Sequence, residues 1–179
     1  MFDLVVQAIG IIAMAIAILS FQAKTQRTII FMQMFSTLLF AVHFFLLGAY
    51  GGVMLNLICA ARSVVYVQIH KPWASHPAWI FIFSAFSVAS YFITIFALTP
   101  QITLPILLLE ILPVIANVIT TVSQRMKDAK SVRKINVWAS PLWLIYNVVN
   151  HSIGATICES FVIISIIIAM LRLDRKRAE

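Results

Sequence analysis

Long apolar stretches alternate with short polar breaks along the whole chain. Runs of spanning length occur at residues 4–22, 28–48, 52–69, 78–98, 103–122, 133–149 and 154–171. A bilayer core of about 30 Å requires about 20 helical residues, so each run is long enough to cross it. The pattern predicts seven transmembrane helices, with tight hairpins at 48–52 and 151–154 and further breaks at Lys71-Pro72 and Thr99-Pro100.

The composition agrees with this membrane assignment. Hydrophobic residues make up 62% of the 179 positions, and charged residues make up 11%. A soluble domain of this length has too little interior to bury so much apolar surface. We therefore expect a multi-pass protein in contact with membrane lipids. Cys59 and Cys158 lie in apolar runs without metal-ligand spacing, and we expect both to be core residues.

Positive charge is confined to alternate connections between the predicted helices. The first, third and fifth connections and the tail hold all the Lys and Arg residues except Arg62: Lys24, Arg27, Lys71, Arg125, Lys127, Lys130, Arg133, Lys134, Arg172, Arg175, Lys176 and Arg177. Cytoplasmic loops are enriched in Lys and Arg, so the N-terminus is predicted outside and the C-terminus in the cytoplasm. The net charge of +7 is thus a topology signal, and we expect no nucleic-acid partner.

A weak internal repeat predicts how the helices are grouped. A shift of 103 residues pairs Ser20 with Ser123, Lys24 with Lys127, Leu39 with Leu142 and Gly51 with Gly154. The order of spans and loops repeats as well. We predict an all-α integral membrane fold of two parallel three-helix repeats, residues 1–70 and 102–179, joined by a linker helix at 71–101 (3+1+3). The second repeat carries the basic cytoplasmic tail. Parallel repeats of this kind occur in transporters.

Polar residues inside the spans fall on single helix faces at 100° per residue. Glu110, Asn117 and Thr121 share one stripe, for example. Stripes on several helices predict a polar interior that leans toward the outer side. The candidate substrate-binding residues are Asn56, Arg62, Asn117, Trp143 and Asn147. The candidate residues for ion or proton coupling are Glu110, Glu159 and His43. The alternative for each asparagine is interhelical glue, and the alternative for His43 is a structural partner.

Arg62 is the one Lys or Arg residue that lies outside the basic connections and the tail. An arginine at a helix centre costs about 2.5–3.5 kcal/mol on insertion scales, so it requires a partner. Its helix face turns toward the bundle, and we predict that it contacts Glu159 or Glu110, directly or through water. Two roles remain open for it: a static ion pair, or a ligand-binding group at the pocket floor.

Four segments carry a family resemblance: HFFLLGAYGG (43–52), LNLICAAR (55–62), LPV (112–114) and NHSIGATICES (150–160). With these the chain resembles the bacterial inner-membrane proteins of the YgjV type over nearly its whole length. The resemblance implies the bacterial cytoplasmic membrane and names no substrate. More distantly, the 3+1+3 plan looks like the sugar-transporting SWEET and PQ-loop group.

The SWEET-like plan implies a site on the third helix of each repeat. Those transporters place an asparagine there beside the central cavity, a position that Asn56 matches in the first repeat. Glu159 occupies the equivalent position in the second repeat. An acidic residue there differs from the asparagine of a neutral sugar site. The paired Pro-Gln motif is also absent, because Pro113 has Gly10 opposite it and Pro141 has Leu38.

These observations favour transport of a small polar solute, by rocking of one repeat against the other. A non-transporting scaffold, sensor or assembly factor is the alternative. The sequence contains no hydrolase elbow, phosphate loop or metal-ligand cluster, so we expect neither an enzyme nor a cofactor nor a bound metal. The sequence does not identify the substrate, and it does not decide whether the protein forms a homo-oligomer. A transporter requires a solvent path to the polar stripes, whereas a scaffold has them satisfied and dry.

Overall fold

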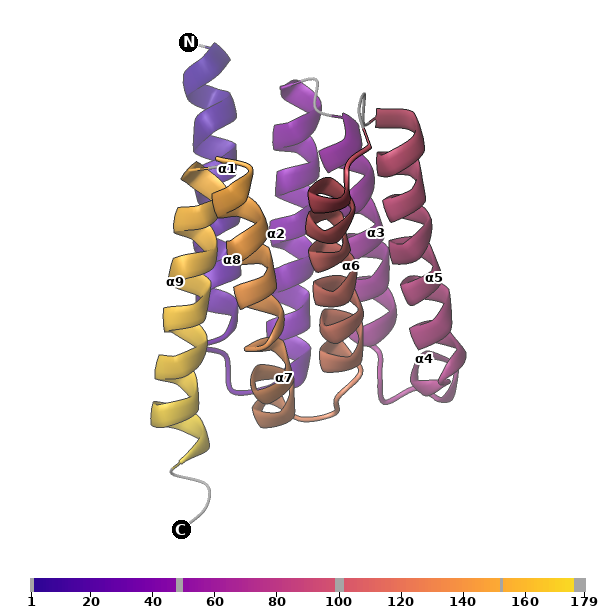
Figure 1. Ribbon diagram of the computed structural model, residues 1–179. Helices are drawn as coiled ribbons and strands as arrows, with labels where there is room; N and C mark the ends of the chain where they lie inside the picture. Colours follow the sequence, from indigo (N-terminus) through magenta and orange to yellow (C-terminus); the bar gives the residue numbers. More distant parts are fainter. Residues whose placement is uncertain (1, 48–49, 99–101, 152, 176–179) are drawn as a thin grey trace.

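The computed structural model describes residues 2–47, 50–98, 102–151 and 153–175, and these residues are helical apart from short connections (Figure 1). The long elements are α1 (Phe2–Ser20), α2 (Gln26–Leu46), α3 (Tyr50–Tyr66), α5 (Ala78–Ile93), α6 (Leu104–Gln124), α8 (Ala139–Val149) and α9 (Ile153–Ala169). Two short helices, α4 (Pro72–Ser75) and α7 (Ala129–Asn136), lie in connections. The π-helical turns η1 (Thr94–Leu98) and η2 (Met170–Asp174) extend α5 and α9.

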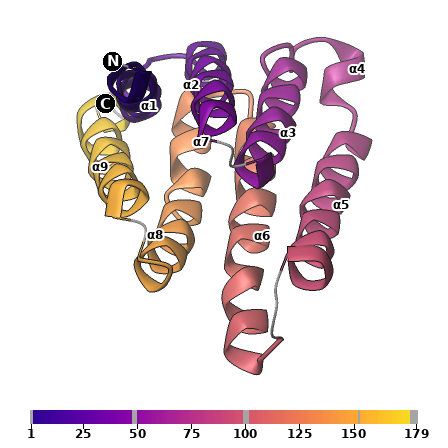
Figure 2. The same ribbon diagram turned by 90° about the horizontal axis from the view of Figure 1, so that it is seen from above.

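The long helices form two layers (Figure 2). One layer is α1, α2 and α3 in order, and the other is α9, α8, α6 and α5. The layers meet at both edges, where α1 packs against α9 and α3 packs against α5 and α6. The helices therefore surround the space between the layers.

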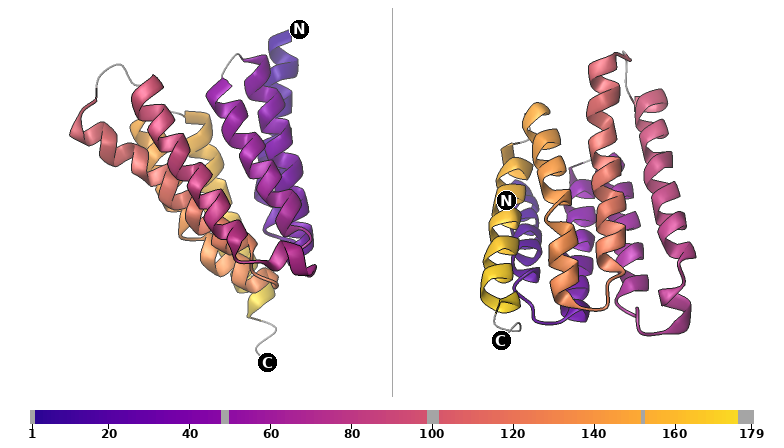
Figure 3. Two further views of the ribbon diagram at one scale, coloured as in Figure 1. Left: turned by 90° about the vertical axis from the view of Figure 1, so that its right-hand side faces the viewer. Right: turned by 60° about the horizontal axis from the view of Figure 1, so that its bottom comes forward.

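The two layers converge at one end of the bundle and splay apart at the other (Figure 3, left). We call the splayed end, which carries the N-terminus, the N-face, and the converging end, with α4 and α7, the C-face. The buried hydrophobic cluster belongs to the C-face half and includes Ile29, Ile30, Tyr66, Val132 and Ile166. Tight packing thus holds the layers together at the C-face.

Most of the predicted spans are confirmed as apolar helices. Gln26–Leu46, Ala78–Ala97, Leu104–Gln124 and Gly154–Asp174 are long and apolar enough to cross a membrane, and Leu4–Ser20 and Leu55–Tyr66 are shorter apolar helices. Helix α1 begins at the N-face and η2 ends at the C-face (Figure 1). The connections that carry basic residues, which join α1 to α2, α3 to α5 and α6 to α8, all lie at the C-face.

The sixth predicted span differs from the continuous helix expected at 133–149. It is divided into α7 and α8, with a break at Val137 and Trp138. Pro141 has no N–H to donate to the carbonyl of Val137 and its ring crowds that carbonyl, which favours a break at this point, whereas α6 continues through Pro113. The 11 residues of α8 rise only about 16 Å, which leaves it shorter than the neighbouring helices.

Local sequence signals fix several element ends. Thr25 caps α2 by accepting the backbone N–H of Thr28 at 3.1 Å, and Asp128 caps α7 by accepting that of Ser131 at 2.8 Å. His151, in the tight connection between α8 and α9, adopts φ of 53°. This left-handed conformation allows the reversal that the sequence predicts at 151–154.

Candidate functional site

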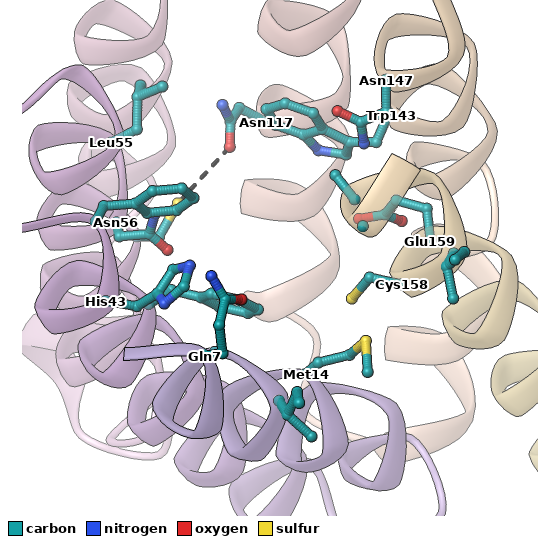
Figure 4. A pocket seen from close by; sticks show the side chains of 18 residues that line it. Gln7, Met14, His43, Leu55, Asn56, Asn117, Trp143, Asn147, Cys158 and Glu159 are labelled. Carbon is teal, nitrogen blue, oxygen red and sulfur yellow. Dashed lines mark hydrogen bonds between the residues drawn. The ribbon is translucent and has the colours of Figure 1, made fainter. Parts of the chain in front are cut away.

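A cavity of about 630 Å³ lies between the two layers, toward the N-face (Figure 4). Side chains from α1, α2, α3, α6, α8 and α9 line it, and it is partly open to its surroundings. Of the eight predicted site residues, six line this cavity: His43, Asn56, Asn117, Trp143, Asn147 and Glu159. Helical periodicity predicted that these residues lie on the polar faces of their helices, and those faces line the cavity. The volume is in the range of small-molecule sites, about 300–1,000 Å³.

The first layer contributes Gln7, His43 and Asn56 to the polar lining. The Nδ1 atom of His43 donates a hydrogen bond to the carbonyl of Val6 on α1 at 2.8 Å, which ties α2 to α1. Gly10 makes this arrangement possible, because a Cβ at this position would lie 2.9 Å from Cε1 of His43. His43 is therefore held in place by structural contacts while it lines the cavity.

The second layer contributes Asn117, Trp143 and Asn147. Trp143 and Asn147 lie one turn apart on α8, so they share a face. The side-chain oxygen of Asn117 on α6 lies 3.9 Å from the thiol sulfur of Cys59 on α3, which donates a weak hydrogen bond across the two layers. Together with Gln7 on α1 and Asn56 on α3, amide groups from four helices thus surround the same space as one indole ring.

Glu159 on α9 supplies a carboxyl group to the cavity (Figure 4). The hydroxyl of Ser140 on α8 hydrogen-bonds its side chain. Within the part of the chain that the structure describes, the one ion pair joins Arg133 to Asp174, so no Lys or Arg pairs with Glu159. The site consequently has an acidic group without an ionic partner of its own.

Apolar side chains form the remaining lining, among them Met14, Phe40 and Phe44. The Phe40 and Phe44 rings are stacked with their centroids 6.2 Å apart. Both thiols, of Cys59 and Cys158, line the cavity and are partly buried. Cys158 also packs against the buried hydrophobic cluster, as expected of a core residue. A largely apolar wall with a few convergent polar groups is typical of ligand sites.

Arg62 points into the bundle, as predicted, and is 4% exposed. The predicted direct contact with Glu159 or Glu110 is wrong. Nε donates to Oε1 of Gln124 at 3.2 Å, and Nη1 donates to the carbonyl of Asn117 at 3.2 Å and to Oγ1 of Thr121 at 3.1 Å. Its partners among the described residues are all neutral. Depth along a helix does not reveal the direction of a long side chain, and this one reaches α6 on the C-face side of the cavity.

Glu110 also lies outside the cavity lining, contrary to the prediction. The hydroxyl of Tyr146 on α8 donates to Oε1 of Glu110 at 3.1 Å, with Oε2 at 3.4 Å. This contact joins α6 to α8 within one layer. The carboxylate is therefore a link between neighbouring helices, and its helix stripe alone could not distinguish that position from the cavity.

Sequence reasoning missed a layer of amide groups on the C-face side of the cavity. Gln124 donates from Nε2 to Oε1 of Gln33 at 2.9 Å. Gln26 donates from Nε2 to the carbonyl of Tyr66 at 2.9 Å and to that of Gln124 at 3.2 Å. The signal was present for Gln124, which continues the stripe of Asn117 and Thr121 by one more turn. We call Gln26, Gln33, Arg62 and Gln124 the C-face network.

A second missed feature concerns residues interpreted as topology signals. Arg133 on α7 is 2% exposed and pairs with Asp174 at the end of η2. It also donates from Nη1 to the carbonyls of Phe21 and Ala23, at 3.1 and 2.8 Å. Arg133 thus links α7, η2 and the connection between α1 and α2 at the C-face, in addition to carrying positive charge.

Comparison with known protein families identifies a match over nearly the whole chain. A family model for Imp-YgjV, described as a bacterial inner membrane protein, matches residues 4–177. Neither the curated proteins nor the solved structures contain a significant match.

Proposed function

The chain belongs to the Imp-YgjV family of bacterial inner membrane proteins, and we propose that it carries a small polar solute across that membrane by alternating access. The observation that carries the proposal is the cavity of about 630 Å³ between the layers. It is large enough for a small organic solute, has polar groups from both layers, and is partly open. A dry, fully satisfied interior would instead favour the scaffold or sensor alternative.

Contacts between the layers support two parallel repeats. Arg62 on α3 donates to Oγ1 of Thr121 on α6 at 3.1 Å. Ser165 on α9 donates to the carbonyl of Ile18 on α1 at 2.6 Å. Ser165 lies 103 residues after Arg62, and Thr121 lies 103 residues after Ile18. The third helix of each proposed repeat therefore contacts the first helix of the other at equivalent positions.

The order of helices around the cavity agrees with the same division. Seen from above, α1 and α6 lie at diagonal corners, α3 and α9 occupy the other two corners, and α2 lies across from α8 (Figure 2). A rotation by half a turn about an axis along the bundle exchanges these pairs. Helix α5 lies outside this set, as a linker helix would. A shared axis along the membrane normal is the geometry of parallel transporter repeats.

The C-face network is the proposed gate. Arg62 and Gln124 connect α3 to α6, while Gln33 connects α2 to Gln124. Opening the C-face requires these hydrogen bonds to break. Each neutral hydrogen bond contributes about 0.5–1.5 kcal/mol net, and those of the guanidinium about 1.5–3 kcal/mol. Such contacts hold the gate closed and still allow exchange, because the C-face network contains no ion pair, and the pair at the C-face joins Arg133 on α7 to Asp174 on η2.

The basic connections orient the cavity. By the positive-inside rule the C-face lies in the cytoplasm and the N-face outside. The cavity then opens outward while the C-face network closes the cytoplasmic side. In this proposal the conformation described is the outward-facing one, and solute release follows when the layers rock to converge at the N-face. Asn56, Asn117, Trp143 and Asn147 would contact the solute.

Uptake into vesicles tests the proposal. Purified protein is screened by thermal shift against sugars, amino acids, organic acids, amines and nucleobases, and each stabilising compound is tested for counterflow in proteoliposomes. Asn147→Leu, which keeps the branching of the side-chain heavy atoms and removes a cavity amide, should abolish both effects. The matched control is Asn150→Leu, because Asn150 is exposed and outside the cavity lining. Compounds that bind without counterflow would contradict transport and favour a sensor.

A further inference from the structure

We infer that the cavity selects a small organic cation, with the carboxylate of Glu159 as its counter-charge. The inference deepens the proposed function by naming the chemical class of the solute, and it rests on that function for the transport step only. Glu159 points from α9 into the cavity, between Trp143 and Cys158 (Figure 4). Among the described residues that line the space, it is the one Asp, Glu, Lys or Arg.

The protein directs its own cations away from this carboxylate. Arg62, the basic residue within the spans, is bound to neutral oxygens of Asn117, Thr121 and Gln124. The ion pair among the described residues lies at the C-face, between Arg133 and Asp174. A carboxylate removed from water without a cation is unfavourable, and the single hydroxyl of Ser140 does not neutralise it. A ligand cation would supply the missing charge.

The surrounding groups suit an organic cation better than a bare metal ion. Aromatic faces attract cations, and Trp143, Phe40 and Phe44 all line the cavity. The side-chain oxygens of Asn117 and Asn147 can accept N–H bonds from an ammonium group. By contrast, the described residues contain no group of three or more His, Cys, Asp or Glu side chains placed to hold a metal. The volume also exceeds what a single ion requires.

Anionic and neutral solutes fit this site less well. An anion would be repelled by Glu159 in a medium of low dielectric constant, where charge interactions are several-fold stronger than in water. A neutral sugar would leave the carboxylate without a counter-charge. A protonated Glu159 would remove both objections, so the test has to report the charge state of the cavity directly.

Cys158, adjacent to Glu159, allows that measurement without knowledge of the solute. In a Cys59→Ser background it is the single thiol of the chain. The probes are two methanethiosulfonates of similar size, one carrying a trimethylammonium group and one a sulfonate, applied at pH 7.5 to protein in nanodiscs. Their rates are normalised to those with a small thiol in solution, so differences in intrinsic reactivity cancel.

The inference predicts that the cationic reagent modifies Cys158 at least about tenfold faster than the anionic one after normalisation. Glu159→Gln should reduce this ratio to near one, and Glu159→Asp, which retains the charge, should preserve it.

Equal normalised rates in the parent, or a ratio that survives Glu159→Gln, would overturn the cation site and leave transport of another solute standing. No reaction with either reagent would overturn both, since a closed cavity admits no solute. A high ratio without counterflow of any bound amine would overturn transport alone.

Discussion

Arg62 on α3 and Gln124 at the end of α6 are joined across the two layers by a hydrogen bond of 3.2 Å from Nε to Oε1. Arg62 is 4% exposed and Gln124 is 3% exposed, so neither side chain has bulk water as an alternative partner. A charge placed in a membrane protein interior is thus satisfied by neutral acceptors. This contact is the centre of the C-face network and the basis of the first prediction.

Arg62→Met should lower the free energy of unfolding by about 2–3 kcal/mol, because the guanidinium's hydrogen bonds to Gln124, Thr121 and Asn117 are lost inside the bundle. Gln124→Leu should cost less, and the double variant should cost less than the two single changes added together. Thermal unfolding in detergent provides these values. As a control, Arg62→Met combined with Glu159→Ala should be additive, since no contact joins the two residues. A strong coupling between Arg62 and Glu159 would contradict the geometry.

Asp174→Asn should be among the most destabilising changes at the C-face. It leaves the guanidinium of Arg133 buried without its counter-charge, and removing one partner of a buried pair costs about 3–5 kcal/mol. The same unfolding assay, with Arg172→Gln as an exposed control in the same segment, measures the effect. A loss below about 1 kcal/mol would show that Asp174 is effectively solvated.

Gly10→Ala should destabilise the protein by about 1–3 kcal/mol through overpacking. Its Cβ would lie 2.9 Å from Cε1 and 3.0 Å from Nδ1 of His43, so the ring must move and weaken its bond to Val6. Gly154→Ala is the matched control, because a Cβ there meets nothing within 4 Å. That change should instead stabilise α9 by about 0.5–1 kcal/mol, from helix propensity. Equal effects at the two glycines would contradict the close approach of Gly10 and His43.

Asp128 should contribute a stability that depends on pH. Burial alone would raise the pKa of its carboxyl, but hydrogen bonds, chiefly from the backbone and side chain of Ser131, outweigh burial and lower the pKa. A lowered folded pKa gives stability that is present above the unfolded pKa of about 3.9 and lost as pH falls through the folded value. The difference between the parent and Asp128→Asn should therefore be constant from about pH 8 to pH 5 and shrink below about pH 4. A difference unchanged at acid pH would exclude the charged cap.

Hydrophobic patterning predicted the helical fold because spans of about 20 apolar residues have few alternative structures. Helical periodicity also brought His43, Asn56 and Asn117 to one cavity, since polar side chains avoid lipid. The prediction of a continuous sixth span was wrong, because the helix is interrupted just before Pro141 within the predicted span. The predicted direct contact of Arg62 with a glutamate was also wrong, because the depth of a residue does not determine which acceptors its flexible side chain reaches. Those partners are set by the packing of α3 on α6, which no local pattern contains.

The central claim, a cavity whose access alternates between the two faces, can be tested without a substrate. The measurement is the rate at which a membrane-impermeant thiol reagent modifies Cys158, in the Cys59→Ser background, in sealed right-side-out and inside-out membrane vesicles. The account predicts fast modification from the outer side and slow modification from the cytoplasmic side. It further predicts that Arg62→Met, which opens the C-face network, raises the cytoplasmic-side rate several-fold and lowers the outer rate. Equally slow modification from both sides in both variants would contradict the claim and indicate a closed, static bundle.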